Sequence, residues 1–228
     1  MGENTMNCHP LTTSELPLQA LLFLPENRDA STPLMVYLHG AGERGTKLDH
    51  LYRHGVPKLI QSGKEIPAIV LCPQCPAPFV WNNIVEKLKQ LIDIVAAQYA
   101  VLPDRISITG SSMGGYGTWE MGLTYPNFFS AIAPVAGGGL SWRCSKLVTT
   151  PVLACHGTAD EAVPFVYSQL MVDVTNQAGG DAQLIALEGF GHNDGINEAY
   201  FGTHMLDWLL AQRRTNFEYV KEVCEDLF

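Results

Sequence analysis

One short stretch of the sequence, Thr-Gly-Ser-Ser-Met-Gly-Gly-Tyr-Gly at 109–117, combines a nucleophilic side chain with glycines on both sides. Gly110 and Gly114 lie two residues before and two residues after Ser112, which gives the pattern G-x-S-x-G. This pattern is typical of a nucleophile elbow, a turn from strand to helix so sharp that only small residues fit beside the serine. The stretch therefore predicts that Ser112 is an exposed catalytic nucleophile.

The alternative is a glycine- and serine-rich loop that matches a short pattern by chance. Ser112 follows an apolar, β-branched run at 105–109 and precedes a helix-like pattern at 114–125. An elbow requires this context, so we favour the nucleophile. In this interpretation Gly115 and Gly117 let the helix pack closely on its neighbours.

A serine hydroxyl needs a base that takes its proton, and two later histidines are the candidates. His192 lies in the glycine-rich stretch GFGHND, just beyond the apolar run at 182–187. His204 lies inside a helical pattern, where a structural histidine is the usual case. We therefore predict that His192 is the base. His156 is expected to be a packing or loop residue at the end of its strand.

The base in turn needs a carboxylate that fixes its tautomer, and in proteins with this elbow the acid precedes the histidine along the chain. Asp160, in the stretch HGTADEAVP, follows the apolar run at 151–156 and precedes His192. Glu161 is expected to point elsewhere, and Asp194 is too near the histidine in sequence. We predict that Asp160 is the acid, with a loop or helix-capping carboxylate as the alternative.

Two backbone N–H groups should stabilise the oxyanion that forms during acyl transfer. One follows the nucleophile directly and belongs to Met113; the other comes from the loop after an early strand. In the loop HGAG, Gly40 and Gly42 let the backbone turn inward, so we predict that Ala41 supplies the second group. His39 is then structural support.

The same loop allows a second interpretation, because Gly40, Gly42 and Gly45 fit the dinucleotide pattern G-x-G-x-x-G. A dinucleotide site needs an acid at the end of the next strand, but the next apolar run ends in LCPQC. Glu43 would also lie beside the phosphates. A nucleotide-dependent oxidoreductase is therefore disfavoured, and we expect no organic cofactor.

A pair of cysteines, Cys72 and Cys75, could form a redox couple or half of a zinc site. No second close pair accompanies them, and the surrounding prolines favour a loop over the start of a helix. We expect thiols without either function, and no metal.

The elements that must position these residues alternate between short apolar runs and helix-like segments. Strands are expected at 19–24, 34–39, 68–72, 105–109, 130–136, 151–156 and 182–187, and helices at 82–99, 114–125, 165–178 and 198–213. Several runs are apolar on both faces, as in strands that helices cover on both sides. The alternation favours a mostly parallel central sheet with helices on both faces, and the site loops leave the carboxyl ends of its strands.

Composition limits the class of protein. The 228 residues are 46% hydrophobic and 16% charged and show no linker, so we expect one domain at 1–228, with a core at 19–212 and an acidic tail at 215–228. The net charge of −9 disfavours nucleic acid and anionic membranes as partners. No signal peptide is recognisable, which favours a cytoplasmic location. A homo-oligomer is left open.

With these residues in place, the chain resembles the α/β-hydrolase serine esterases of the phospholipase/carboxylesterase type and of the feruloyl- or acetylxylan-esterase type, including bacterial proteins described as predicted peptidases. The resemblance runs through LHGAGERG, CPQCPAPFVWN, PDRISITGSSMGGYGTW, APVAGGG, HGTADEAVP, GFGH and WLLAQ, within residues 19 to 212. It implies an α/β-hydrolase fold, the triad Ser112, Asp160 and His192, and hydrolysis of small-molecule carboxylic esters through an acyl-enzyme. It implies no metal or cofactor.

Two features of the chain bear on the substrate that this resemblance implies. No insertion long enough for a large lid is visible, which favours soluble esters, with acyl- or feruloyl-carbohydrate esters as candidates. Members of the group often carry an aromatic residue soon after the histidine, whereas this chain continues Asn193-Asp194-Gly195-Ile196. We expect this change to reshape the pocket wall without abolishing catalysis.

Substrate contacts are predicted at Trp81, Tyr116, Glu43 and Arg44. Three further aromatic residues near predicted loops could join them: Phe79, Trp119 and Trp142. Most buried aromatic residues belong to the core, and Trp119 is expected to do so. An ion pair of Glu43 with Arg44 that orders the loop is the alternative for the two charged residues.

Two other functions compete with ester hydrolysis. A peptidase-like amide hydrolase would need an extended groove or a gating domain, for which the chain has little spare length. A non-catalytic binding module on a hydrolase scaffold is disfavoured because all three triad positions are filled.

Overall fold

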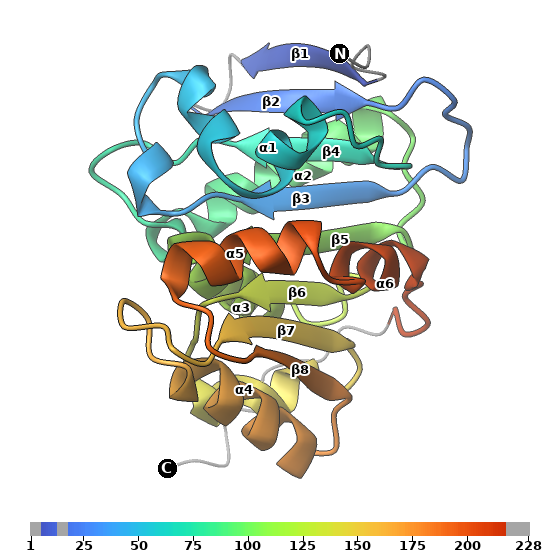
Figure 1. Cartoon of the computed structure of the whole chain (residues 1–228). Coiled ribbons are helices and arrows are strands. Elements are labelled where there is room, and N and C mark those ends of the chain that lie inside the picture. The colour runs from blue at the N-terminus through green and yellow to red at the C-terminus, as the bar shows by residue number, and fades with distance from the viewer. Residues whose placement is uncertain (1–5, 13–17, 218–228) are drawn as a thin grey trace.

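The computed structural model describes residues 6–12 and 18–217, which form an eight-stranded sheet with helices on both faces (Figure 1). The strands are β1 (Asn7–Thr12), β2 (Gln19–Leu24), β3 (Leu34–Leu38), β4 (Ile69–Pro73), β5 (Ile106–Ser111), β6 (Ile132–Val135), β7 (Val152–Gly157) and β8 (Ala182–Leu187). Their order in the sheet is β1-β2-β4-β3-β5-β6-β7-β8. Strand β2 is antiparallel to β1 and β4, and all other neighbours are parallel, so the predicted mostly parallel sheet is confirmed. The predicted acidic tail lies, beyond residue 217, outside the described residues.

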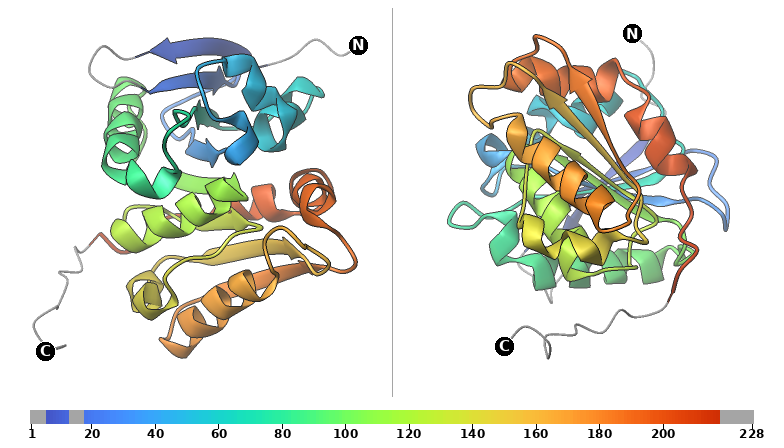
Figure 2. Two further views of the ribbon diagram at one scale, coloured as in Figure 1. Left: turned by 90° about the vertical axis from the view of Figure 1, so that its left-hand side faces the viewer. Right: turned by 90° about the horizontal axis from the view of Figure 1, so that it is seen from below.

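Two helical layers enclose the sheet, which lies between them when the molecule is turned (Figure 2). Helices α2 (Val85–Gln98), α3 (Met113–Thr124) and α4 (Val166–Gln177) pack on one face, and α1 (Gly55–Gln61), α5 (His192–Phe201) and α6 (Met205–Ala211) pack on the other. Each face therefore has its own apolar core. Every residue of β3, β4, β5, β6 and β7 is buried, which explains why β3, β4 and β6 read as apolar runs, whereas β5 and β7 also bury polar residues near their carboxyl ends.

The seven strands expected from the sequence are all present, each with its ends within two residues of the expected position. Strand β1 was not expected, because its sequence NCHPLT is polar and contains Pro10. A proline cannot donate to a neighbouring strand, but β1 lies at the edge of the sheet and pairs on one side with β2, where a proline is tolerated.

The helix expected at 198–213 is wrong, because the chain forms two helices there. Helix α5 begins earlier, at His192, and ends at Phe201, and α6 begins at Met205. The side chain of Thr203 separates them: its hydroxyl donates to Ala199 O at 2.7 Å and accepts from the N–H of Met205 at 3.2 Å. The Thr203 hydroxyl thus links the last turn of α5 to the first residue of α6, between the C-cap Gly202 and the N-cap His204.

The remaining helical elements were too short for periodicity to reveal. They are α1 and the short 3-10 segments Ala41–Glu43, Leu48–Arg53, Trp81–Asn83 and Ser141–Leu147. Two of them, Ala41–Glu43 and Trp81–Asn83, lie in loops that shape the site described below.

Helix α3 lies very close to the sheet because its first turn is rich in glycine. A Cβ atom on Gly114 would lie 1.9 Å from the carbonyl oxygen of Leu38 at the end of β3. A Cβ atom on Gly115 would lie 2.3 Å from the oxygen of Val135 at the end of β6. Backbone atoms occupy both places, so larger residues are excluded unless the helix moves.

We expect Gly114→Ala to destabilise the protein by about 3 kcal/mol or more, because the clash with backbone outweighs the better helix propensity of alanine. The matched control is Gly122→Ala on the same helix, whose Cβ would meet the side-chain ends of Ile132 and Leu147 at 3.0 and 3.1 Å. These methyl groups can shift, so the loss should be small. Urea unfolding measures both, and equal losses would contradict the close approach of α3.

Candidate active site

Ser112 occupies the turn between β5 and α3 with an unusual backbone conformation. Its φ of 55° and ψ of −119° lie where residues other than glycine are rare and strained. Two hydrogen bonds hold the turn, from its N–H to Val135 O at 3.0 Å and from the N–H of Tyr116 to its own carbonyl at 3.1 Å. A Cβ on Gly110 would lie 2.5 Å from Gly114 O. The glycines of the motif thus clear the space that the elbow needs.

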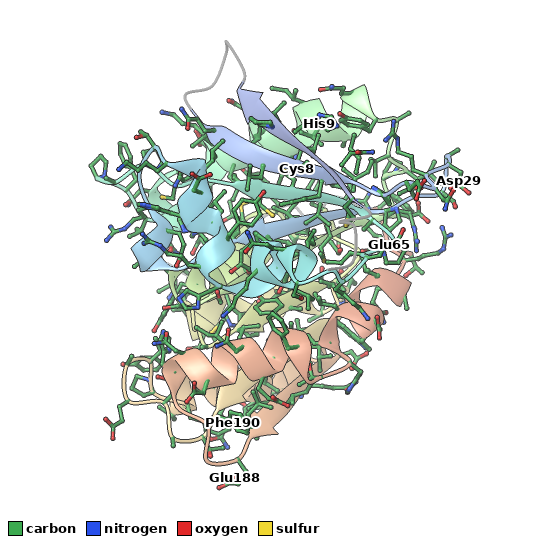
Figure 3. All side chains as sticks on the ribbon, turned by 45° about the horizontal axis from the view of Figure 1, so that its top comes forward. Cys8, His9, Asp29, Glu65, Glu188 and Phe190 are labelled. Atoms are coloured by element: carbon green, nitrogen blue, oxygen red, sulfur yellow. The ribbon has the colours of Figure 1, made fainter. Side chains whose placement is uncertain are left out.

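His192 lies against the serine hydroxyl, with 3.0 Å between His192 Nε2 and Ser112 Oγ. The loop after β8 brings it there, and Figure 3 labels Phe190 in this loop beside α5. The carbonyl of Phe190 accepts a hydrogen bond at 3.0 Å from the N–H of Ala159 in the loop after β7. The two loops are therefore tied side by side at the same edge of the sheet.

Asp160, in the loop after β7, completes the row. Its Oδ2 lies 2.6 Å from His192 Nδ1, and its Oδ1 accepts from the N–H groups of Ala162 and Val163 at 2.9 and 2.8 Å. Burial by itself raises the pKa of Asp160, but the hydrogen bonds from Val163 and His192 outweigh it and leave the pKa below its usual value. A charged Asp160 keeps a proton on Nδ1 and leaves Nε2 free to accept the serine proton.

His156, which the sequence predicted to be a packing or loop residue, is a neighbour of this row. The side chain is fully buried, with Nε2 2.9 Å from Val163 O and 3.3 Å from Asp160 Oδ2. Both oxygens can only accept, so Nε2 carries a proton. Nδ1 lies 2.7 Å from Ser168 Oγ, and burial lowers the pKa of His156. His156 thus helps to hold Asp160; its spacing of four residues before the acid was the available signal.

The two backbone groups predicted for the oxyanion both open helical segments. Met113 is the first residue of α3, and Ala41 the first of a 3-10 segment, so neither N–H has a partner within its own segment. Residues 39–43 contain Ala41 and are called the oxyanion loop here, after the role predicted for Ala41. Three successive carbonyls of this loop accept hydrogen bonds from side chains. Gly40 O accepts from His39 Nδ1 at 2.6 Å, and Ala41 O and Gly42 O accept at 3.0 Å from Arg44 and Arg53, respectively.

The buried side chain of His39 holds this loop in place through both of its ring nitrogens. Its Nδ1 donates to Gly40 O, and its Nε2 accepts the N–H of Cys75 at 2.9 Å, so both nitrogens of a neutral ring are used. Burial lowers the pKa of His39 to about 4, against an ordinary value of 6.5. The indole N–H of Trp81 donates to the His39 carbonyl at 2.9 Å. The predicted structural role of His39 agrees with these contacts.

The four residues predicted to contact substrate lie in four different places. Trp81 is fully buried beneath the oxyanion loop and offers no surface to a substrate, which contradicts that prediction. Tyr116 lines a different hollow of about 290 Å³, together with Tyr167 and Leu170. Glu43 lies in the pocket that contains Ser112.

Arg44 orders the loop, but not through the predicted ion pair. Its guanidinium donates to Ala41 O and, at 3.4 and 3.5 Å, to the carbonyls of Ala77 and Phe79. Among the other aromatic candidates, Trp119 is fully buried as expected. Phe79 and Trp142 are exposed.

The pocket at Ser112 has a volume of about 250 Å³. The oxyanion loop forms one wall, from Gly40 to Glu43, and the first turns of α5 form the other, with Asn193 and Ile196. The hydroxyl, the imidazole and the oxyanion loop therefore converge on one hollow. This arrangement suits nucleophilic attack on a carbonyl carbon.

The thiols of Cys72 and Cys75 take no part in the row of Ser112, His192 and Asp160. Cys72 and Cys75 are free and buried, and burial raises the pKa of Cys75 to about 11 and that of Cys72 well above its ordinary value. A redox couple needs a lowered thiol pKa. Within residues 6–12 and 18–217, no three histidine, cysteine or acidic side chains gather as metal ligands would. None of the helices in that part of the chain is long and apolar enough to cross a membrane.

The sheet order, the elbow at Ser112 and the contacts from serine to histidine to aspartate define an α/β-hydrolase. A sequence profile described as Phospholipase/Carboxylesterase matches residues 80–200, which is more than half of the chain. The protein belongs to that family.

Similar proteins agree with this assignment. Poly(3-hydroxyalkanoate) depolymerase C of Paucimonas lemoignei is 26% identical over 169 residues, which cover 67% of this chain and 38% of that protein. Carboxylesterase SOBER1 of Arabidopsis thaliana is 27% identical over 125 residues, which cover 51% of this chain and 55% of that protein. The chain thus spans less than two thirds of the length of these two relatives.

Solved structures extend the likeness over nearly the whole chain. The crystal structure of a thermostable esterase has a TM-score of 0.76 and 27% identity, covering 92% of this chain and 64% of that chain. The feruloyl esterase module from Clostridium thermocellum has a TM-score of 0.71 and covers 94% of this chain and 90% of that one. At 14% identity, the second likeness shows the fold alone.

We expect the free energy of unfolding to fall as the pH falls from 6.5 toward 4, because of His39. The unfolded chain takes up the proton near pH 6.5, whereas the folded chain resists it until about pH 4. The stabilisation is therefore complete above pH 6.5, and about 3 kcal/mol is lost over this range. Urea unfolding at a series of pH values measures the loss, to which His156 contributes in the same direction.

The control for this prediction is His39→Gln. This variant should be less stable at neutral pH but should lose much less stability between pH 6.5 and 4. An equally steep loss in the variant would show that other groups cause it.

Proposed function

We propose that the protein is a serine hydrolase that cleaves small carboxylic esters through an acyl-enzyme. The observation that carries the proposal is the unbroken row from Ser112 Oγ to His192 Nε2 at 3.0 Å and from His192 Nδ1 to Asp160 Oδ2 at 2.6 Å. It lies in a pocket beside the oxyanion loop. The family and the relatives named as carboxylesterases support the same reaction.

In this mechanism, Ser112 Oγ attacks the ester carbonyl while His192 Nε2 accepts its proton. The N–H groups of Met113 and Ala41 stabilise the negative charge on the carbonyl oxygen. Asp160 holds His192 in place and stabilises the imidazolium. His192 then protonates the leaving alcohol and, in the second half-reaction, activates the water that releases the acid.

The substrate class is proposed at the level of a small ester. The curated relatives include enzymes named for polyester depolymerisation and for carboxylic esters, and the pocket of about 250 Å³ fits a short chain better than a large ring system. The burial of Trp81 removes one aromatic side chain that a feruloyl group would have used. A cytoplasmic location, a homo-oligomer and a single domain stay predictions of the sequence.

Ser112→Ala should lower kcat/KM for p-nitrophenyl acetate by at least about a thousandfold, because the acyl-enzyme cannot form. The matched control is Ser111→Ala, which removes the neighbouring hydroxyl, one that is buried and 3.2 Å from the hydroxyl of Tyr37. It should keep activity within about threefold. Mass spectrometry of the wild-type protein should find one acyl group on Ser112.

Two outcomes would contradict the proposal. Equal hydrolysis by wild type and Ser112→Ala, or none by either, would favour a non-catalytic binding module. Faster cleavage of 4-nitroacetanilide than of the ester would favour an amide hydrolase.

A further inference from the structure

Glu43 is a buried carboxylate in the wall of the pocket, and no step of the proposed reaction uses it. The residue is 4% exposed. Within residues 6–12 and 18–217, no group donates a hydrogen bond to its carboxylate. Two histidine nitrogens lie at the limit of ion-pair distance: His39 Nδ1 is 3.8 Å from Oε2, and His54 Nε2 is 4.0 Å from Oε1. The carboxylate lines the pocket that contains Ser112, so a ligand in that pocket can supply the donor that the protein does not.

The carboxylate lies next to the nucleophile. A Cβ atom on Gly40 would lie 3.2 Å from Glu43 Oε2 and 3.6 Å from Ser112 Cβ. Glu43 and Ser112 therefore flank the same residue, and because that residue is glycine, no side chain separates them. A group of the substrate that is bonded within a few atoms of the reacting carbonyl can reach the carboxylate.

The positive charges nearby do not neutralise Glu43. Arg44 and Arg53 donate to the carbonyls of Ala41 and Gly42. The Nδ1 proton of His39 is committed to Gly40 O. His54 lines the same pocket, and its Nδ1 is buried without a hydrogen-bond partner among the described residues. Arg44, Arg53 and His39 are thus committed to backbone carbonyls, and none of the three donates to the Glu43 carboxylate.

We propose that Glu43 binds a hydroxyl group of the substrate, so that the favoured substrates are carboxylic esters with a hydroxyl a few bonds from the ester carbonyl. The inference rests on the proposed function as an ester hydrolase. A hydroxyl donates to a carboxylate in a charge-assisted hydrogen bond. An ester without the hydroxyl leaves the buried carboxylate unpaired, and sites of this kind reject such analogues strongly.

The test compares kcat/KM within two matched pairs of esters. On the acyl side, p-nitrophenyl 3-hydroxybutyrate is compared with p-nitrophenyl butyrate, and on the alcohol side 2-hydroxyethyl butyrate is compared with propyl butyrate. We expect the wild type to prefer the hydroxylated ester of one pair by about tenfold or more. Glu43→Leu should abolish the preference, and Glu43→Gln, whose amide oxygen still accepts, should keep part of it.

The control variant is Glu188→Leu, which loses the same charge at an exposed position after β8 (Figure 3). Its preference should equal that of the wild type. A wild-type ratio near one in both pairs would overturn the role of Glu43. So would an equal fall for both esters of a pair in Glu43→Leu, because a purely structural role lowers both alike.

The same measurements keep the two proposals apart. Turnover of the plain esters that depends on Ser112, without a hydroxyl preference, overturns the inference and leaves the proposed function standing. Absence of turnover with every ester overturns the proposed function. In that case, calorimetry measures the binding of the intact esters to Ser112→Ala and to the double variant that also carries Glu43→Leu. Tighter binding of the hydroxylated ester to Ser112→Ala that is lost in the double variant supports the role of Glu43. Equal binding of both esters to Ser112→Ala overturns that role.

Discussion

The close approach of helix α3 to the ends of strands β3 and β6 is the constraint on which the rest of the site depends. Carbonyl oxygens of Leu38 and Val135 fill the places where side chains of Gly114 and Gly115 would lie. Because the helix begins so close to the sheet, the chain must turn within one residue, and Ser112 takes the strained conformation. The histidine, the acid and the oxyanion loop are useful only because this turn presents the hydroxyl at the sheet edge.

The parallel arrangement of the strands brings the acid, the histidine and the oxyanion loop to the same edge of the sheet. Asp160 follows β7, His192 follows β8 and Ala41 follows β3, and the carboxyl ends of parallel strands share one edge of the sheet. Hydrogen bonds between the loops after β7 and β8, such as that from Ala159 to Phe190, set the final distances. The topology supplies proximity, and the loop contacts supply alignment.

Much of this could be predicted because the demands are local. The elbow requires small residues two positions before and two positions after Ser112. Strands that are buried on both faces consist largely of apolar residues, which a sequence shows directly. The predicted triad residues therefore lie together in the structure. Their order along the chain and their places after strands were sufficient to single them out.

The features that were not predicted depend on contacts in the folded chain that a local sequence pattern does not reveal. Strand β1 exists because β2 offers it an edge, and α5 and α6 separate because of one hydroxyl, that of Thr203. Trp81 looked like a loop residue for substrate, but its indole N–H bonds to a carbonyl 42 residues earlier in the chain. His156 supports Asp160 through a contact that is visible only in three dimensions.

The bonding of the oxyanion loop has a consequence for the rate as well as for the fold. Its three carbonyls are held by His39, Arg44 and Arg53, and His39 is held by Cys75 and Trp81 from another loop. The free N–H groups are therefore oriented before any substrate arrives, and little reorganisation remains for the moment of attack. In the proposed mechanism, folding has thus already aligned the dipoles that stabilise the transition state, and the buried Trp81 would serve catalysis by fixing the orientation of the His39 carbonyl.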